Sequence, residues 1–170
     1  GGNYAIGRYA MMDANAGSNS LASTSNIAIG QSALGGTWVD TASNYNTAIG
    51  HLSMDSALDG ALYNVSLGYV SLSAITTEDN NVALGAGSLQ ELTTGESNIA
   101  IGRASMNVHG TGSYNIAIGS FAMDDTDAGS TSKSSQHNIF IGLNAGGGTW
   151  TDVASNYNVA IGNYSMDSPL

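Results

Sequence analysis

One nine-residue pattern recurs nine times along this chain of 170 residues and restricts its fold more than any other feature. Its places 1 to 9 read Asn, apolar, Ala, apolar, Gly, two variable residues, a small residue, and Met or Leu. The nine asparagines of place 1 are Asn3, Asn26, Asn46, Asn64, Asn81, Asn98, Asn115, Asn138 and Asn158. The nine glycines of place 5 are Gly7, Gly30, Gly50, Gly68, Gly85, Gly102, Gly119, Gly142 and Gly162. Regular repeats of this kind indicate units that bury their apolar residues by stacking on their neighbours.

The distances between successive asparagines reveal a longer period of 112 residues. They are 23, 20, 18, 17, 17, 17, 23 and 20 residues, so the series restarts after six coils. A shift of 112 residues pairs residues 1–58 with 113–170, and 35 of these 58 pairs are identical. Because neither end carries a polar capping repeat, we expect residues 1–170 to form one segment of a longer array.

The apolar residues of the repeat alternate with period 2, which favours a β-strand over a helix. Ile and Val are frequent at places 2 and 4, and the Gly of place 5 suits a turn. A second short strand is expected to carry the small residue and the Met or Leu. The sequence thus predicts an all-β parallel solenoid of nine coils, with two short strands per coil. The stacked asparagines should form a hydrogen-bonded ladder along its axis.

The two faces of the predicted strand differ in the size of their side chains. Places 2 and 4 are expected to face a thin core together with the Met or Leu of place 9. Asn, Ala and Gly then share the opposite face, since side chains alternate along a strand. Because this face is small and flat in nearly every coil, we expect another chain to pack against it.

Residues 26–34, which read Asn-Ile-Ala-Ile-Gly-Gln-Ser-Ala-Leu, and their eight counterparts resemble the head repeats of YadA-like trimeric autotransporter adhesins. They are equally similar to the Asn-Thr-Ala-Ile-Gly-x-x-Ala-Leu arrays of phage tail-fibre proteins. The resemblance spans the whole chain and implies a left-handed parallel β-roll that assembles as a homotrimer. The sequence departs from the pattern in its long connectors and at Ser66, Phe140 and Gly146.

Both families imply a structural and adhesive role outside the cell. We therefore expect a fibre segment from a virion tail fibre or a bacterial cell-surface adhesin, with the phage form slightly favoured. Such a segment presents binding surfaces away from the particle or cell, where a host-surface glycan or protein receptor is the expected partner. The alternatives are a carbohydrate-binding module and a self-assembling extracellular filament.

The composition argues against several other classes of function. The net charge of −10, from 13 acidic and 3 basic residues, leaves no basic surface for nucleic acid or an anionic membrane. Cysteine is absent, and no apolar run is long enough to insert into a membrane. His51, Ser53 and Asp55 lie close together, but the 112-residue shift replaces His51 with Asn163. The sequence therefore predicts neither an enzyme nor a bound cofactor.

Two pairs of acidic and amide residues in the connectors are candidates for calcium binding. Asp13 with Asn15, and Asp125 with Asp127, follow the pattern Asp-x-(Asn/Asp)-x-Gly at equivalent places. This pattern resembles the first half of a calcium loop, although the bidentate Glu of such loops is missing. An Asx turn at the end of the coil explains the same residues without a metal.

Aromatic residues of the connectors are candidates for glycan binding. Trp38 with Tyr45 recurs as Trp150 with Tyr157, which is the one aromatic pair that both connectors share. Aromatic rings stack on the apolar faces of sugars, so these residues could form a glycan platform. Alternatively, each Trp buries its large apolar surface over the flank of the solenoid or in a contact between chains.

Overall fold

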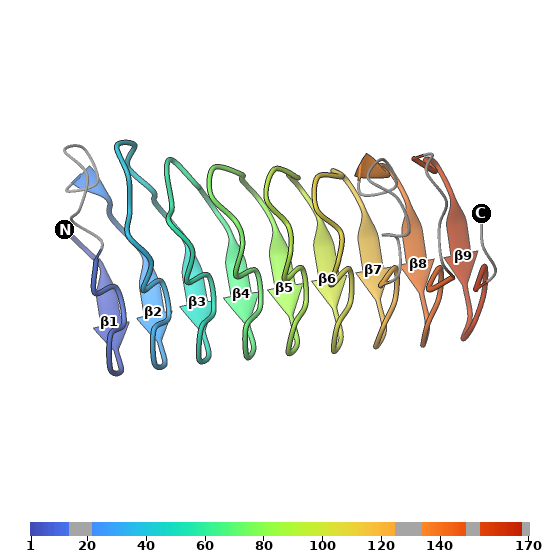
Figure 1. Ribbon diagram of the computed structural model, residues 1–170, viewed down its shortest axis with the longest axis horizontal. Coiled ribbons are helices and arrows are strands. Elements are labelled where there is room, and N and C mark those ends of the chain that lie inside the picture. The colour runs from blue at the N-terminus through green and yellow to red at the C-terminus, as the bar shows by residue number, and fades with distance from the viewer. Residues whose placement is uncertain (14–21, 125–133, 149–153, 168–170) are drawn as a thin grey trace.

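The computed structural model describes residues 1–13, 22–124, 134–148 and 154–167. Nine three-residue strands form one parallel sheet in chain order and lie side by side along the long axis (Figure 1). They are β1 (Tyr4–Ile6), β2 (Ile27–Ile29), β3 (Thr47–Ile49), β4 (Val65–Leu67), β5 (Val82–Leu84), β6 (Ile99–Ile101), β7 (Ile116–Ile118), β8 (Ile139–Ile141) and β9 (Val159–Ile161). The predicted all-β parallel solenoid is confirmed.

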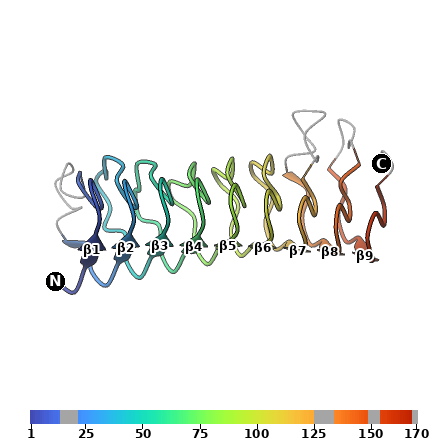
Figure 2. The same cartoon turned by 90° about the horizontal axis from the view of Figure 1, so that it is seen from below.

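Equivalent places of the repeat lie directly beside each other in this sheet. Ala28 aligns with Ala48, and Ala83 aligns with Ala100, although the connectors between these pairs differ in length. Each coil therefore adds one rung of the sheet, which corresponds to an advance of ~4.7–4.9 Å. The sheet forms one side of the molecule, and the remainder of each coil stands on the other side (Figure 2).

The segment that follows each conserved glycine contains turns where the sequence predicts a second strand. Places 7 and 9 have positive φ angles, for example 55° at Ser32 and 50° at Leu34. These residues still bond to both neighbouring coils. The N–H of Ser32 donates to the carbonyl of Arg8 (2.9 Å), and the N–H of Leu34 donates to that of Ser53 (3.0 Å). The segment thus keeps a ladder of hydrogen bonds between coils while its backbone bends.

The core contains the small residue at place 3 of the repeat, whereas the apolar residues at places 2 and 4 face outward. Ala28 and Ala83 are fully buried, as is Leu34 at place 9, but Ile29 is 37% exposed and Leu67 is 47% exposed. The predicted orientation of the strand, and with it the predicted packing of another chain on the Asn/Ala/Gly face, is therefore wrong. The asparagine determines the orientation, because its amide forms its hydrogen bonds inside the coil. Alternation then places Ala and Gly inside as well.

The asparagines of place 1 are joined by hydrogen bonds from coil to coil. At a central step, Oδ1 of Asn98 accepts from the backbone N–H (3.0 Å) and from Nδ2 (3.1 Å) of Asn115. Nδ2 of Asn98 donates to the carbonyl of Gly112 in the connector (2.9 Å). Asn98 and Asn115 are fully buried. Because a buried amide left without a partner costs about 1–3 kcal/mol, few other side chains could replace Asn here.

The conserved glycines lie where consecutive coils approach each other most closely. All nine have φ angles between 131° and 157°. At Gly102, a Cβ atom would lie 2.4 Å from the carbonyl oxygen of Gly119 in the next coil. Both the backbone conformation and the lack of space therefore require glycine at this place.

Candidate functional site

The calcium candidates fall mostly outside the residues that the structure describes. Asp13 lies in a described turn, whereas Asn15, Asp125 and Asp127 lie outside the described ranges. Within those ranges, no group of three or more His, Asp or Glu side chains could hold a metal ion. The structure thus leaves the calcium loops as a prediction.

The residues His51, Ser53 and Asp55 are not brought together as a catalytic group. Ser53 is fully buried, and its Oγ donates to Oγ of Ser66 at 2.8 Å. His51 is exposed at the opposite end of the turn, where its ring contacts Tyr69. Burial raises the pKa of the Asp55 carboxyl, while its own backbone N–H and the charge of His51 oppose that shift. The described part of the chain also contains no helix with the length and hydropathy needed to cross a bilayer.

Trp38 is fully buried, so its ring is not accessible to a sugar. Its backbone N–H donates to the carbonyl of Asp13 (3.2 Å), which fixes it against the preceding coil. The prediction of a sugar platform that includes Trp38 is therefore wrong, and the alternative, packing over the solenoid, describes this residue. Trp150 lies outside the described residues.

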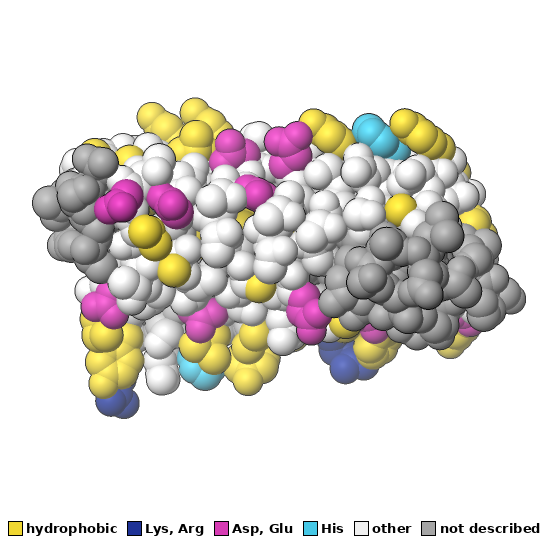
Figure 3. All heavy atoms as spheres, turned by 45° about the horizontal axis from the view of Figure 1, so that its top comes forward, with side chains coloured by type: hydrophobic (Ala, Val, Ile, Leu, Met, Phe, Trp, Pro, Cys, Tyr) yellow, Lys and Arg dark blue, Asp and Glu magenta, His cyan; other side chains and the backbone are white. Residues whose placement is uncertain are grey.

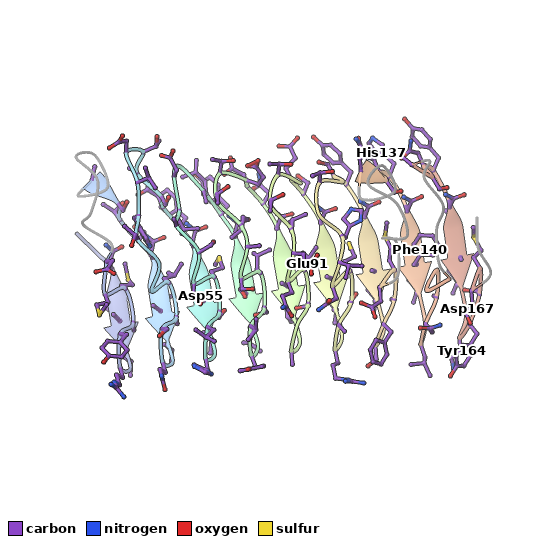
Figure 4. All side chains as sticks on the ribbon, viewed as in Figure 1. Asp55, Glu91, His137, Phe140, Tyr164 and Asp167 are labelled. Carbon is purple, nitrogen blue, oxygen red and sulfur yellow. The ribbon has the colours of Figure 1, made fainter. Side chains whose placement is uncertain are left out.

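The tyrosines of the two predicted pairs belong to a row of aromatic rings along one edge. Tyr45 stacks on Tyr63 with ring centroids 5.0 Å apart, and His137 stacks between Tyr114 and Tyr157 at 5.1 Å from each. In each contact the ring planes differ by 2°. Figure 4 shows His137 at this edge. Sequence analysis missed three of these residues, although all five directly precede a ladder asparagine, which is the signal that would have found them.

The outward side of the sheet is the largest candidate surface. It consists of places 2 and 4 of all nine coils, and Thr47 is its one polar residue. We call it the apolar sheet face. Its most exposed members are Tyr4, Ile6, Ile27, Ile29, Val65, Leu67, Ile101, Val159 and Ile161. A contiguous apolar surface of this kind marks a site of contact with another molecule, because water leaves it unsatisfied.

His109 is a further buried group that the sequence did not single out. It is fully buried, and Nδ2 of the ladder residue Asn115 lies 3.0 Å from its Nε2. Burial lowers the pKa of His109 to about 4, despite an opposing hydrogen bond with the backbone of Gly112. The imidazole is therefore neutral in the folded protein at neutral pH.

We expect acid to destabilise the fold through His109. In the unfolded chain the imidazole takes up a proton near pH 6.5, whereas in the folded chain it does so only near pH 4. The free energy of unfolding should thus fall as the pH drops from 6.5 to 4, by about 3 kcal/mol from this residue. Urea unfolding at pH 7 and pH 4 would measure the loss. It should be smaller in His109→Gln and unchanged in His137→Gln, and an unchanged loss in His109→Gln would contradict the assignment.

Comparisons with protein-family models, with curated proteins and with solved structures found no match. Within the described residues, the features that could serve a function are the apolar sheet face and the two edges where the coils turn.

Proposed function

We propose that this chain is a segment of an extracellular structural and adhesive fibre, from a phage tail fibre or a bacterial surface adhesin. Its chains form a homotrimer and meet through the apolar sheet face. The observation that supports this proposal is the continuity of that face over all nine coils. Since every coil contributes the same pair of places, the contact area grows in proportion to the number of coils. A shaft that must stay assembled along its whole length needs such a contact.

The energetics favour burial of this face. Fully burying an Ile, Val or Leu side chain stabilises by ~1.5–3 kcal/mol, so covering a side chain that is already about 60% buried contributes on the order of 1 kcal/mol. Ile29, Val65 and Ile101 are in this state, with 36–38% of their surface exposed. Summed over nine coils, the gain is comparable to or larger than the ~4–15 kcal/mol that association costs in lost freedom.

The trimeric state and the left-handed sense of the coils follow from the resemblance of the repeat to the adhesin and tail-fibre families. Three sheet faces around a common axis would leave both turn-bearing edges of every chain outside. Those edges would then be free to contact a glycan or protein receptor. The adhesive role is assigned to the edges and the structural role to the face.

Replacing Ile101 with Asp should convert the trimer to monomers. Ile101 lies at the end of β6 with 36% of its surface exposed, so the folded coil tolerates a polar side chain there. In the trimer, however, three carboxylates would be buried near one axis, where their desolvation and mutual repulsion disfavour assembly. Sedimentation equilibrium would measure the mass, and circular dichroism would verify that the coils remain folded.

Val39→Asp provides the matched control. Val39 is 39% exposed, close to the value for Ile101, but it lies in a connector away from the sheet. This variant should remain trimeric. A wild-type protein that sediments as a monomer, or an Ile101→Asp variant that stays trimeric, would refute the proposed contact. A dimeric wild type would retain the face and refute the trimer.

A further inference from the structure

A pocket of about 440 Å³ interrupts the edge of the solenoid at the turn that follows β5. At this edge each coil presents its places 6 and 7. In the coil of β5 these are Ala86 and Gly87, the smallest pair at these places in the chain. The coils on either side present larger residues, Tyr69 and Arg103 at place 6. The missing side chains of one coil thus leave a gap between the side chains of its neighbours.

The floor of the pocket is continuous backbone with two amide side chains. The N–H of Gly87 donates to the carbonyl of Tyr69 (2.9 Å), which ties this coil to the preceding one. Nδ2 of Asn107 donates to the carbonyl of Gly87 (2.9 Å) and to Oε1 of Gln90 (3.2 Å). These bonds orient both amides. A Cβ atom on Gly87 would lie 3.1 Å from Nδ2 of Asn107, so a side chain at residue 87 would occupy the pocket.

Each wall of the pocket is supported from its far side. Tyr69 is 58% exposed and contacts the ring of His51 at 5.5 Å, and His51 belongs to the coil that precedes it. The guanidinium of Arg103 lies 4.3 Å from the ring centroid of Phe121, in the coil that follows it. Cation–π contact holds the guanidinium plane against that ring. The two walls therefore keep their separation when the pocket is empty.

The separation of the walls fits one six-membered ring. Tyr69 and Arg103 are two coils apart, which corresponds to ~9.5 Å along the axis. A ring between them needs a contact distance of ~3.5–4 Å on each side. The tyrosine ring offers an apolar face to the C–H groups of a sugar, and the two amides offer partners to its hydroxyls.

The charge of Arg103 specifies the ligand further. It is one of three basic residues in a chain with 13 acidic ones, yet it forms no ion pair with the residues that the structure describes. The two basic side chains visible in Figure 3 lie along the lower edge of that view. A guanidinium pairs with a carboxylate through two parallel hydrogen bonds, and this pairing would offset the general repulsion of anions by the chain.

We propose that this pocket binds one hexuronic acid unit of an acidic polysaccharide. The pyranose ring lies against Tyr69, its carboxylate pairs with Arg103, and its hydroxyls bond to Gln90 and Asn107. This site rests on the proposed adhesive role of the edges, but it does not require the trimer. It is also distinct from the aromatic pairs of the connectors.

Titration of the ¹⁵N-labelled protein with glucuronate, glucose and acetate tests the proposal. Glucuronate should shift the amide resonances of Gly87 and the side-chain amides of Gln90 and Asn107. Glucose and acetate, which lack the carboxylate or the ring, should bind at least ten-fold more weakly. Equal binding of glucose would refute the role of Arg103, and equal binding of acetate would refute the sugar.

Three variants separate the pocket from general effects of charge. Arg103→Gln should weaken glucuronate binding at least ten-fold. Arg8→Gln is its matched control, because Arg8 occupies the same place of the repeat and lies 4.4 Å from the ring of Tyr9 without flanking the gap. It should bind as the wild type does. Gly87→Ser should abolish binding and still fold, since Ser32 occupies the equivalent place with a φ of 55°.

Failure of the pocket and failure of the proposed fibre are distinguishable. No response to any of the three compounds would refute the pocket, whereas the mass of the protein in solution would still report on the trimer. Conversely, a monomeric protein that binds glucuronate through Arg103 would retain the pocket and refute the proposed assembly.

Discussion

Replacing Gly102 with Val should destabilise the solenoid by at least ~3 kcal/mol. The residue has a φ of 132°, and a Cβ atom would lie 2.4 Å from the carbonyl oxygen and 2.5 Å from the carbonyl carbon of Gly119. Neither atom belongs to a flexible side chain, so the two coils would have to separate. Separation breaks the ladder bonds on both sides of the glycine, and backbone strain adds ~1–3 kcal/mol. Urea unfolding followed by circular dichroism would measure the loss.

Gly162→Val separates the two causes of this loss. Gly162 has a φ of 131°, nearly the same as Gly102, but a Cβ atom there would have no neighbour within 4 Å. The control should therefore show the cost of the backbone conformation alone, about 1–2 kcal/mol. Equal losses at the two glycines would mean that the approach of the next coil does not explain the conservation of glycine. A loss below 1 kcal/mol at Gly102 would contradict both explanations.

The solenoid could be predicted because its repeat carries the constraint in each copy. The parallel register follows from equal places stacking on each other, and the Asn and Gly mark the two points where a coil contacts its neighbours. The orientation of the strand could not be predicted from alternation, because a period of 2 defines two faces without saying which is inside. Size was misleading here. The interior is so narrow that Ala28 fills it, whereas the larger Ile27 and Ile29 lie outside.

The candidate site was harder to predict than the fold, because it depends on residues that vary between coils. The gap at Ala86 and Gly87 becomes visible only when the neighbouring coils are aligned beside them. Gly87 drew attention instead as part of a glycine-rich sequence. Trp38 was taken for a surface residue because it lies in a connector, yet the connector folds back and buries it. Connector length and composition do not reveal such packing.

The two departures of the β8 coil from the repeat compensate each other in the core. Phe140 replaces the small residue of place 3, and Gly146 replaces the Met or Leu of place 9. Both are buried, and Figure 4 shows Phe140 on β8. A Cβ atom on Gly146 would lie 2.5 Å from Cδ1 of Phe140, so the phenyl ring occupies the volume of the missing side chain. The preceding coil has the usual pair, Ala117 and Met123, both fully buried.

Each single reversion in this coil should therefore be strongly destabilising. Phe140→Ala leaves a cavity and should cost ~3–5 kcal/mol. Gly146→Met forces a side chain into the phenyl ring and should cost ~3 kcal/mol or more. The positive φ angle of Gly146, 66°, does not explain a loss, because Met123 adopts 54° at the same place.

The double variant Phe140→Ala with Gly146→Met should recover the stability of the wild type to within about 1 kcal/mol. It restores the pair that the other coils bury, so the methionine fills the cavity that the phenylalanine leaves. The coupling free energy of the double-mutant cycle should then reach ~5 kcal/mol, above the usual range for residues in contact. Urea unfolding of the four proteins at pH 7 measures it. Losses that simply add would show that the two residues do not share one volume, and the compensation would have to be abandoned.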